Sequence, residues 1–351
     1  MPLKLPEAEH QKLFETNEAP APLLDLLSAY GFRMLSTAVR LGVFEVLREG
    51  PLIAAEAAGR LGVDPRGLEL LLRPLATSGY LERDGEGYAN TPMTEKWLLA
   101  DSRDSMVEMV AFHDTLQVHL WGDLEKSVRA GEPPRDYYRW LREHPDTLRR
   151  FQELLGGLAR TWGDKIAELS ALPESSRRLL DLGGGHGLYT AAFLRRYPGL
   201  RATVFDLPEA LEVGRENAVE TGLEDRICFQ GGDLLRDDFG GGYDVVLLAS
   251  TVHCFLPEQN AHLVRRVRDA LNPGGRVVIV EQLSETRPGD TLLRRAFLQT
   301  FSINLFHLMG AQLYSQETIA EWLADGGFES PEVQPVGESS FTLLAARRTE
   351  D

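Results

Sequence analysis

The sequence is poor in cysteine and in positive charge, and it contains no long apolar run. Its 351 residues include only two cysteines, Cys228 and Cys254, too few for a disulfide framework or a cysteine-rich zinc site. The 37 Lys and Arg side chains are outnumbered by 53 Asp and Glu, so the formal net charge at pH 7 is −16. Because so acidic a chain has no surplus of cations for phosphates, we expect neither nucleic acid nor a membrane as a partner.

The N-terminal segment and the distribution of apolar residues along the chain indicate where in the cell the protein is found. The first ten residues, MPLKLPEAEH, carry prolines and acids where a signal peptide needs an apolar core. No stretch approaches the roughly 20 continuous apolar residues of a membrane helix. The sequence therefore predicts a cytoplasmic protein, and its 43% hydrophobic residues are typical of a globular chain with one large or two medium domains.

The N-terminal third has the pattern of helices followed by a hairpin. Apolar residues recur every three or four positions over 23–47, with Gly42 as a break. Helices are predicted at 54–61 and 66–78, the second with a cap at Asp64 and a proline at its first position. Two short strands, 80–83 and 88–90, then flank a turn at 84–87. Helix, turn, helix and hairpin together predict a winged helix.

A winged helix often binds DNA, but this one lacks a basic face. Residues 33–99 contain eight Lys and Arg against nine Asp and Glu, and the second helix offers only Arg66 and Arg73. We interpret the module as a packing or dimerisation domain. A winged-helix regulator that senses a metabolite remains the alternative from a different functional class.

The remaining chain divides at about residue 172. A helical pattern covers 101–170, where aromatic and histidine side chains either line a substrate cavity or form simple core. After it, strands at 179–182, 203–207, 227–230, 244–250 and 276–281 alternate with helices near 188–197, 208–221 and 258–271, and two closing strands follow at 334–336 and 341–346. This alternation predicts an α/β, Rossmann-like domain with a mostly parallel seven-stranded sheet and helices on both faces. The expected domains are 1–100, 101–172 and 173–351.

A glycine-rich loop follows the first of these strands. It reads Asp181-Leu-Gly183-Gly-Gly185-His-Gly187. A dinucleotide fingerprint requires a glycine at position 188, which is Leu188. Gly-x-Gly-x-Gly with an acid two residues earlier is instead the loop associated with S-adenosylmethionine. The sulfonium of S-adenosylmethionine is a cation. Its binding therefore does not need the positive end of a helix, which a phosphate would use.

Two further acids follow the next two strands. Asp206 is placed to accept hydrogen bonds from both ribose hydroxyls. Asp233 is placed to accept from the adenine amino group, with Leu234 packed on the ring. Asp206 also precedes Leu-Pro-Glu, where a helix cap is the simpler role. Acids at three successive strand ends favour a cofactor site.

Several motifs together resemble a known family over nearly the whole chain. They are LLRPLATSGYL (71–81), SVRAGEP (127–133), LDLGGGHG (180–187), VFDLP (204–208), LNPGGR (271–276) and GGF (326–328). The sequence is similar to the plant-type small-molecule O-methyltransferases and their bacterial relatives, which join a winged-helix dimerisation domain to a methyltransferase domain. The resemblance implies a homodimer, an S-adenosylmethionine cofactor without a metal, and cofactor contacts from Asp181, Gly183, Gly185, Gly187, Asp206, Leu207, Asp233, Leu234 and Ser250.

The resemblance also implies a catalytic base. His253 follows the fourth strand, at the edge where open α/β sheets bind ligands, and it matches the histidine of the family's His-Asp-Trp triplet, although Cys254 stands in place of the aspartate. Glu281 matches an acid that orients this histidine by hydrogen bonding. A histidine that simply caps the strand end is the alternative.

The second flanking acid of the family becomes Leu313 in an ungapped alignment. The acceptor is then a more acidic hydroxyl or a ring carbon, or another group such as His307 or Tyr314 assists. The residues expected along the substrate wall are Phe112, His113, Trp121, Phe301, Asn304 and His307, with core packing as the alternative for His307. We therefore predict an O-methyltransferase of secondary metabolism acting on an aromatic or polyketide-like small molecule, with C-methylation or a non-methylating activity as alternatives.

Overall fold

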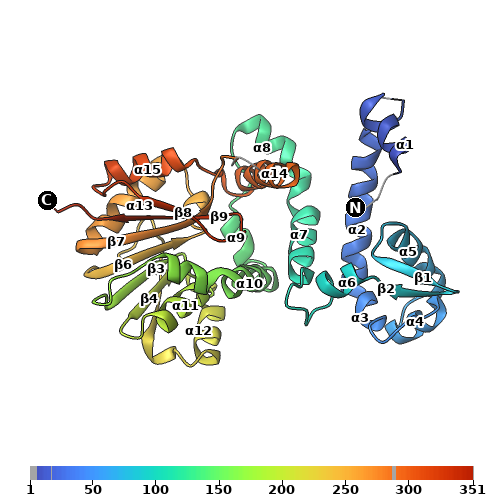
Figure 1. The fold of residues 1–351 in the computed structure, drawn as a ribbon, viewed down its shortest axis with the longest axis horizontal. Helices are drawn as coiled ribbons and strands as arrows, with labels where there is room; N and C mark the ends of the chain where they lie inside the picture. The colour runs from blue at the N-terminus through green and yellow to red at the C-terminus, as the bar shows by residue number, and fades with distance from the viewer. Residues whose placement is uncertain (1–5, 17, 287–289, 351) are drawn as a thin grey trace. The chain divides into compact units, whose positions relative to one another are not determined.

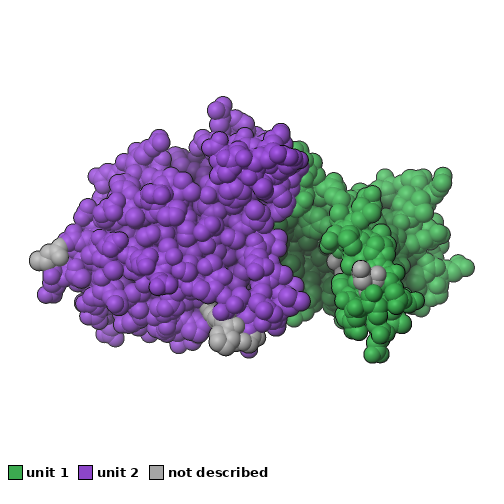
Figure 2. Space-filling model, turned by 90° about the horizontal axis from the view of Figure 1, so that it is seen from above, with its two compact units in different colours: residues 1–119 green, residues 120–351 purple. Residues whose placement is uncertain are grey.

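The computed structural model describes residues 6–16, 18–286 and 290–350. They fall into two compact units, residues 1–119 and 120–351 (Figure 2). The division lies inside the segment 101–172 that the sequence sets apart, so the three-part domain organisation stays a prediction. Among the described residues, no helix is both long enough and apolar enough to cross a membrane.

The first unit is mainly helical and contains the predicted winged helix. Its elements are α1 Glu7–His10, η1 Gln11–Glu15, α2 Pro22–Leu41, α3 Val43–Val46, α4 Ala54–Leu61, α5 Pro65–Thr77, β1 Leu81–Asp84, β2 Gly87–Asn90, α6 Pro92–Trp97 and α7 Val107–His119. The side chain of Asp64 accepts a hydrogen bond from the backbone N–H of Gly67 at 2.8 Å, as expected of a helix cap. Gly42 ends α2 in the left-handed conformation, with φ of 75°. Residues 1–5 and 17 of the expected domain 1–100 lie outside the described residues.

The second unit begins with helices and continues as an alternating α/β domain. Its helical elements are η2 Trp121–Asp123, α8 Leu124–Ala130, α9 Tyr137–Arg142, α10 Pro145–Leu169, α11 Leu188–Arg196, η3 Pro208–Ala210, α12 Leu211–Glu220, η4 Glu224–Arg226, η5 Val252–Cys254, α13 Pro257–Ala270, α14 Leu292–Met309 and α15 Gln316–Asp325. Its strands are β3 Arg178–Leu182, β4 Arg201–Asp206, β5 Ile227–Gly231, β6 Tyr243–Ala249, β7 Leu271–Gln282, β8 Glu332–Pro335 and β9 Phe341–Arg347.

The sheet confirms the predicted fold class. Its strand order is β5-β4-β3-β6-β7-β9-β8 (Figure 1). The first five strands pair in parallel, and β9 pairs antiparallel with both β7 and β8. Successive residues of a strand alternate between two cores: Leu179 packs with α10, α11 and α12, whereas Leu180 packs with α13 and α15. Helices therefore cover both faces, and the buried parallel strands end at one shared edge.

Several predicted elements differ in detail from the structure, among them β7, which begins at Leu271 and not at residue 276 as expected. The helix expected at 208–221 begins as a 3₁₀ turn, Pro208–Ala210, before α12. The third strand ends at Gly231, so Asp233 lies two residues beyond it in a turn. There the side chain of Asp233 accepts from Leu235 N at 2.8 Å, a local bond that competes with strand pairing.

A buried carboxylate joins two helices within the first unit. Asp114 of α7 is 5% exposed. It accepts a hydrogen bond from Ser36 Oγ at 2.7 Å and forms ion pairs with Arg33 and Arg40, all three on α2. Because a buried carboxylate requires such donors, we infer that this cluster fixes α2 against α7.

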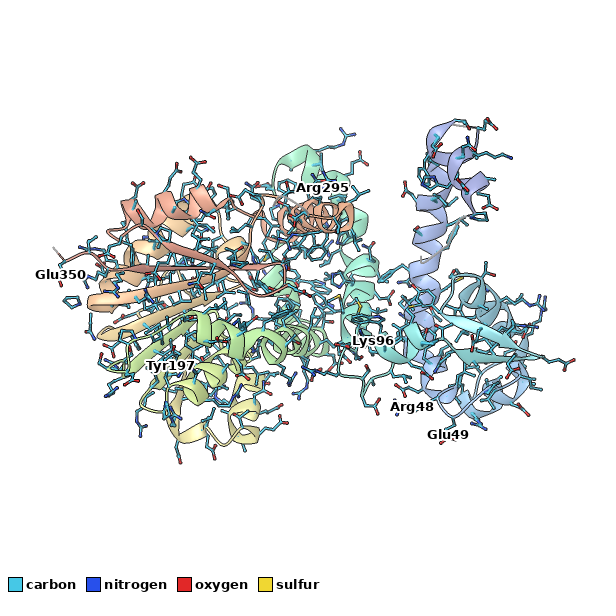
Figure 3. The ribbon with its side chains drawn as sticks, viewed as in Figure 1. Arg48, Glu49, Lys96, Tyr197, Arg295 and Glu350 are labelled. Atoms are coloured by element: carbon cyan, nitrogen blue, oxygen red, sulfur yellow. The ribbon has the colours of Figure 1, made fainter. Side chains whose placement is uncertain are left out.

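Replacing Asp114 should therefore destabilise the protein. We expect Asp114→Ala to lower the free energy of unfolding by about 2 kcal/mol, since it leaves two cations and a hydroxyl without their acceptor. Asp101→Ala is the matched control, because Asp101 is 73% exposed and pairs with Arg48, the arginine labelled in Figure 3. It should cost no more than about 0.5 kcal/mol in denaturant titrations followed by circular dichroism. Equal losses for both variants would contradict the role assigned to Asp114.

Candidate active site

The glycine loop after β3 is held by contacts that require glycine. Gly183 donates its backbone N–H to Phe205 O at 2.8 Å and has a φ of 76°, in the left-handed region. Gly185 donates to Asp206 Oδ2 at 2.9 Å, and a Cβ at this position would lie 2.4 Å from Gln152 Oε1. Gly187 begins α11 with a φ of 68°. The loop therefore approaches its neighbours more closely than any larger residue allows.

Asp181 lies against the loop and away from the solvent. It is 1% exposed and accepts a hydrogen bond from Thr190 Oγ1 at 2.6 Å. A Cβ at Gly184 would lie 2.5 Å from its carboxyl group. Burial raises the pKa of Asp181 to about 7, against the opposing effect of the Thr190 bond. This geometry suits a residue that supports the loop.

A cavity of about 660 Å³ opens in the second unit beside the loop. Its walls come from the ends of four parallel strands and from α9, α10 and α14. The predicted cofactor residues in its lining are Gly183, Asp206, Leu207, Asp233, Leu234 and Ser250. The structure thus brings together, in one mostly apolar cavity, acids that are far apart in the sequence.

The two acids of this lining that the sequence assigns to the cofactor, Asp206 and Asp233, are both partly exposed but have different partners. Asp206 accepts from the backbone N–H groups of Gly185 at 2.9 Å and Leu207 at 2.7 Å. Burial raises its pKa to about 6, although these two bonds oppose the shift. The side chain of Asp233 is 41% exposed and lies 3.7 Å from Arg236, whereas Leu234 is buried.

His253 and Glu281 form a hydrogen-bonded pair at the same sheet edge. Nδ1 of His253, on the turn η5, lies 2.7 Å from Oε2 of Glu281, and Oε1 of Glu281 accepts from Val252 N at 2.9 Å. Glu281 is 1% exposed and the His253 side chain 12%. Since a carboxylate only accepts, Nδ1 carries the proton and Nε2 is left to meet another group.

The environment of His253 favours its protonated form. Burial alone would lower the pKa of the imidazole, but the charge of Glu281 acts in the opposite direction, as does Cys254, and the pKa is raised well above the usual 6.5. The next residue, Cys254, lines the cavity, whereas His253 itself is not among the lining residues.

The second acid that flanks the catalytic histidine in the family aligns with Leu313, so this chain has no carboxylate at that position. Leu313 is 2% exposed and packs with Leu298 and Leu305 of α14. Tyr314 donates its hydroxyl to Phe255 O at 2.6 Å, and burial raises its pKa to about 12. Neither side chain offers a carboxylate to His253.

The candidates for the substrate wall in the second unit occupy different surroundings. Phe301 of α14 meets the His253 ring edge to face, with ring centroids 5.6 Å apart. Asn304 Oδ1 accepts from Trp121 Nε1 at 3.0 Å. Both ring nitrogens of His307 are engaged, by Ser127 Oγ at 2.7 Å and Leu120 O at 3.1 Å. His307 therefore braces α14 against α8, and Phe301 is the candidate that contacts the imidazole.

Phe112 and His113 lie on α7 of the first compact unit, and their contact with substrate stays a prediction. Phe112 is buried in α7, and His113 Nδ1 lies 2.9 Å from Met109 O. Burial lowers the pKa of His113 below its usual value.

Sequence reasoning left one lining residue, Tyr138, open between cavity lining and core, and it missed another, Gln152. Tyr138 of α9 lies beside Cys254 and donates to Met309 Sδ at 3.4 Å; its membership of an aromatic cluster was the available signal. Gln152 of α10 also lines the cavity, and nothing in a helical sequence pattern distinguishes it. Among the described residues, no group of three His, Cys, Asp or Glu side chains is placed to hold a metal ion.

Comparison with known proteins identifies the family. Residues 121–329 match the model of an O-methyltransferase domain, and residues 24–100 match an O-methyltransferase dimerisation domain. The chain is 30% identical to the tetracenomycin polyketide synthesis 8-O-methyl transferase TcmO of Streptomyces glaucescens, over 88% of this chain and 91% of that protein. It is 26% identical to the L-tyrosine C(3)-methyltransferase of Streptomyces lavendulae, over 90% and 88%.

A solved structure gives the same result. The human N-acetylserotonin methyltransferase, in complex with S-adenosylmethionine, is 25% identical and superimposes with a TM-score of 0.79, covering 95% of this chain and 99% of the other. The chain belongs to the O-methyltransferase family, a group of S-adenosylmethionine-dependent enzymes that methylate small molecules, and it carries the family's N-terminal dimerisation domain.

Proposed function

We propose that this enzyme transfers a methyl group from S-adenosylmethionine to a hydroxyl of a small aromatic or polyketide-like molecule, with His253 as the general base. The observation that carries the proposal is the 2.7 Å hydrogen bond between His253 and the buried Glu281, next to a cavity lined by Asp206 and Asp233. TcmO, a relative named for 8-O-methylation in polyketide synthesis, supports the choice of acceptor class.

The residues of the cavity fit an adenosylated donor. Asp206 would accept from the ribose hydroxyls, and Asp233 with Leu234 would hold the adenine. The rest of the cofactor would contact the loop glycines, Leu207 and Ser250. Asp181 would support the loop from behind. The buried Oε1 of Gln152 has no hydrogen-bond partner among the residues that the structure describes, so the cavity contains an acceptor that a ligand donor can satisfy. When bound, S-adenosylmethionine supplies an electrophilic methyl group on a sulfonium.

In the proposed mechanism, His253 removes the proton of the acceptor. Nε2 accepts the proton from the acceptor hydroxyl, whose unperturbed pKa of about 10 for a phenol makes a base useful. Glu281 keeps the proton on Nδ1 and stabilises the imidazolium that forms. Burial of the pair excludes water and holds the base in one orientation, which favours an in-line displacement.

We also propose a homodimer formed through the N-terminal domain. The match of residues 24–100 to a dimerisation domain supports it. So do the exposed apolar side chains of α2, which are Leu23, Leu26, Leu27 and Tyr30. The cytoplasmic location expected from the sequence stays a prediction.

Removal of the base should affect turnover far more than cofactor affinity. We expect His253→Ala to lower kcat about 10²- to 10⁴-fold in a labelled-methyl assay with phenolic acceptors. The affinity for S-adenosylhomocysteine in calorimetry should change by no more than about threefold, because His253 lies outside the adenosyl contacts. His262→Ala, an exposed histidine on α13, is the control and should keep its turnover. Unchanged turnover in His253→Ala would exclude it as the base, and a C-methylated product in NMR would exclude the hydroxyl as acceptor.

The pH dependence of catalysis should report His253. Below its pKa, both ring nitrogens carry protons, so kcat/KM should rise with pH and level off above a pKa that lies well over 6.5. Glu281→Gln removes the negative charge that raises this pKa. The rising limb should therefore move to lower pH, with a lower plateau. A limb that stays in place would show that Glu281 does not set the pKa.

Cofactor affinity should weaken in acid as Asp206 is protonated. Its carboxylate can accept from two hydroxyls only when ionised, so the affinity for S-adenosylhomocysteine should be constant above pH 7 and fall below about pH 6, by roughly tenfold at pH 5. Asp206→Asn should bind weakly at every pH, with little slope. If Asp181→Asn, and not Asp206→Asn, abolishes the slope, the assignment to Asp206 is wrong.

A further inference from the structure

Gln152 has an unsatisfied hydrogen-bond acceptor inside the proposed cofactor cavity. It lies on α10, is 5% exposed and belongs to the cavity lining. Its side-chain oxygen is buried and has no partner among the described residues. Leaving a buried acceptor unpaired is unfavourable, so this oxygen is explained most simply by a donor on a bound molecule.

The oxygen shares one small space with the carboxylate of Asp206. A Cβ on Gly185 would lie 2.4 Å from Gln152 Oε1 and 3.1 Å from Asp206 Oδ2. Both acceptors therefore flank the side of Gly185 on which a side chain is missing. A corner formed by a carboxylate and an amide oxygen attracts a group that brings donors and positive charge.

The free lone pairs of Asp206 and Gln152 indicate which group of a ligand would bind in this corner. Each oxygen of Asp206 already accepts one backbone N–H, from Gly185 or from Leu207, and retains room for one further donor. Two ribose hydroxyls would fill those two places. Gln152 Oε1 is then left for another donor of the same ligand, and the α-ammonium of its amino-acid portion carries three N–H donors and a full positive charge.

We infer that Gln152 is a cofactor-binding residue whose amide oxygen accepts a hydrogen bond from the α-ammonium group of S-adenosylmethionine and of its product. The inference rests on the proposed function of the cavity. A purely structural role is disfavoured because the oxygen makes no hydrogen bond to the glycine loop against which it packs.

The test compares two ligands that differ only at the amino-acid end. S-adenosylhomocysteine carries the α-ammonium, whereas 5′-methylthioadenosine keeps the adenosine and the sulfur without it. Both are titrated by calorimetry into wild type and Gln152→Met, a side chain of similar length without an acceptor. We expect roughly 10- to 100-fold weaker binding of S-adenosylhomocysteine, as for loss of a hydrogen bond to a charged group, and an unchanged Kd for 5′-methylthioadenosine.

The ligand-free variant gives an independent readout. Replacing an unpaired buried acceptor by an apolar isostere is neutral or stabilising, so the Tm of Gln152→Met without ligand should not fall. Gln230→Met is the matched control, because Gln230 lies outside the cavity lining and already donates to Asp238 O at 2.8 Å. It should bind both ligands as wild type does.

Each outcome bears on one claim. If wild type fails to bind S-adenosylhomocysteine, the proposed function fails. If wild type binds but Gln152→Met binds equally well, or loses both ligands equally, the assignment of Gln152 to the α-ammonium is wrong. Should Gln152→Met not fold, Gln152→Glu keeps an acceptor and adds a charge. It should then raise the preference for S-adenosylhomocysteine over 5′-methylthioadenosine, and an unchanged or lower preference would overturn the inference.

Discussion

The position of β3 between β4 and β6 is the constraint on which the rest of the site depends. Parallel strands that pair side by side must end at the same edge, so the segments that leave them meet there. The glycine loop leaves β3, Asp206 ends β4, and the turn with His253 follows β6. Backbone bonds continue the pairing past the strand ends, as from Gly183 N to Phe205 O and from Ser250 N to Val280 O. Groups far apart in the sequence are thereby fixed relative to one another.

Burial at this edge gives the site its electrostatic character. Asp181, Asp206 and Glu281 are carboxyl groups held in or near the core, where a lone charge is costly. Each accepts hydrogen bonds from other parts of the chain: from Thr190 of α11 for the first, from two backbone N–H groups for the second, and from Val252 N and the imidazole for the third. Because these donors belong to the folded chain itself, the acids are already oriented before any ligand arrives.

The sequence allowed prediction of what depends on backbone pattern. The strands, the winged helix and the cap at Asp64 follow from periodicity and turn residues, and Asp206, His253 and Glu281 could be placed because strand ends share an edge. The residues that helices contribute to the site were harder to predict. A helical pattern identifies the buried face, but it does not show that Gln152 directs its amide into a cavity or that both nitrogens of His307 are occupied by Ser127 and Leu120. Such roles depend on which element packs opposite, and on contacts over 180 residues of chain for His307 and Ser127.

The edge-to-face contact between Phe301 and His253 joins two parts of the second unit that differ in their tolerance to amino-acid substitution. The imidazole is held from the sheet, whose strands are fixed by pairing on both sides, whereas Phe301 comes from α14, a helix outside the sheet. Substitutions along α14 can reshape the approach to the imidazole without altering the strand ends that hold the acids. Within this architecture, the acceptor preference can therefore diverge during evolution while the methyl-donor site is conserved.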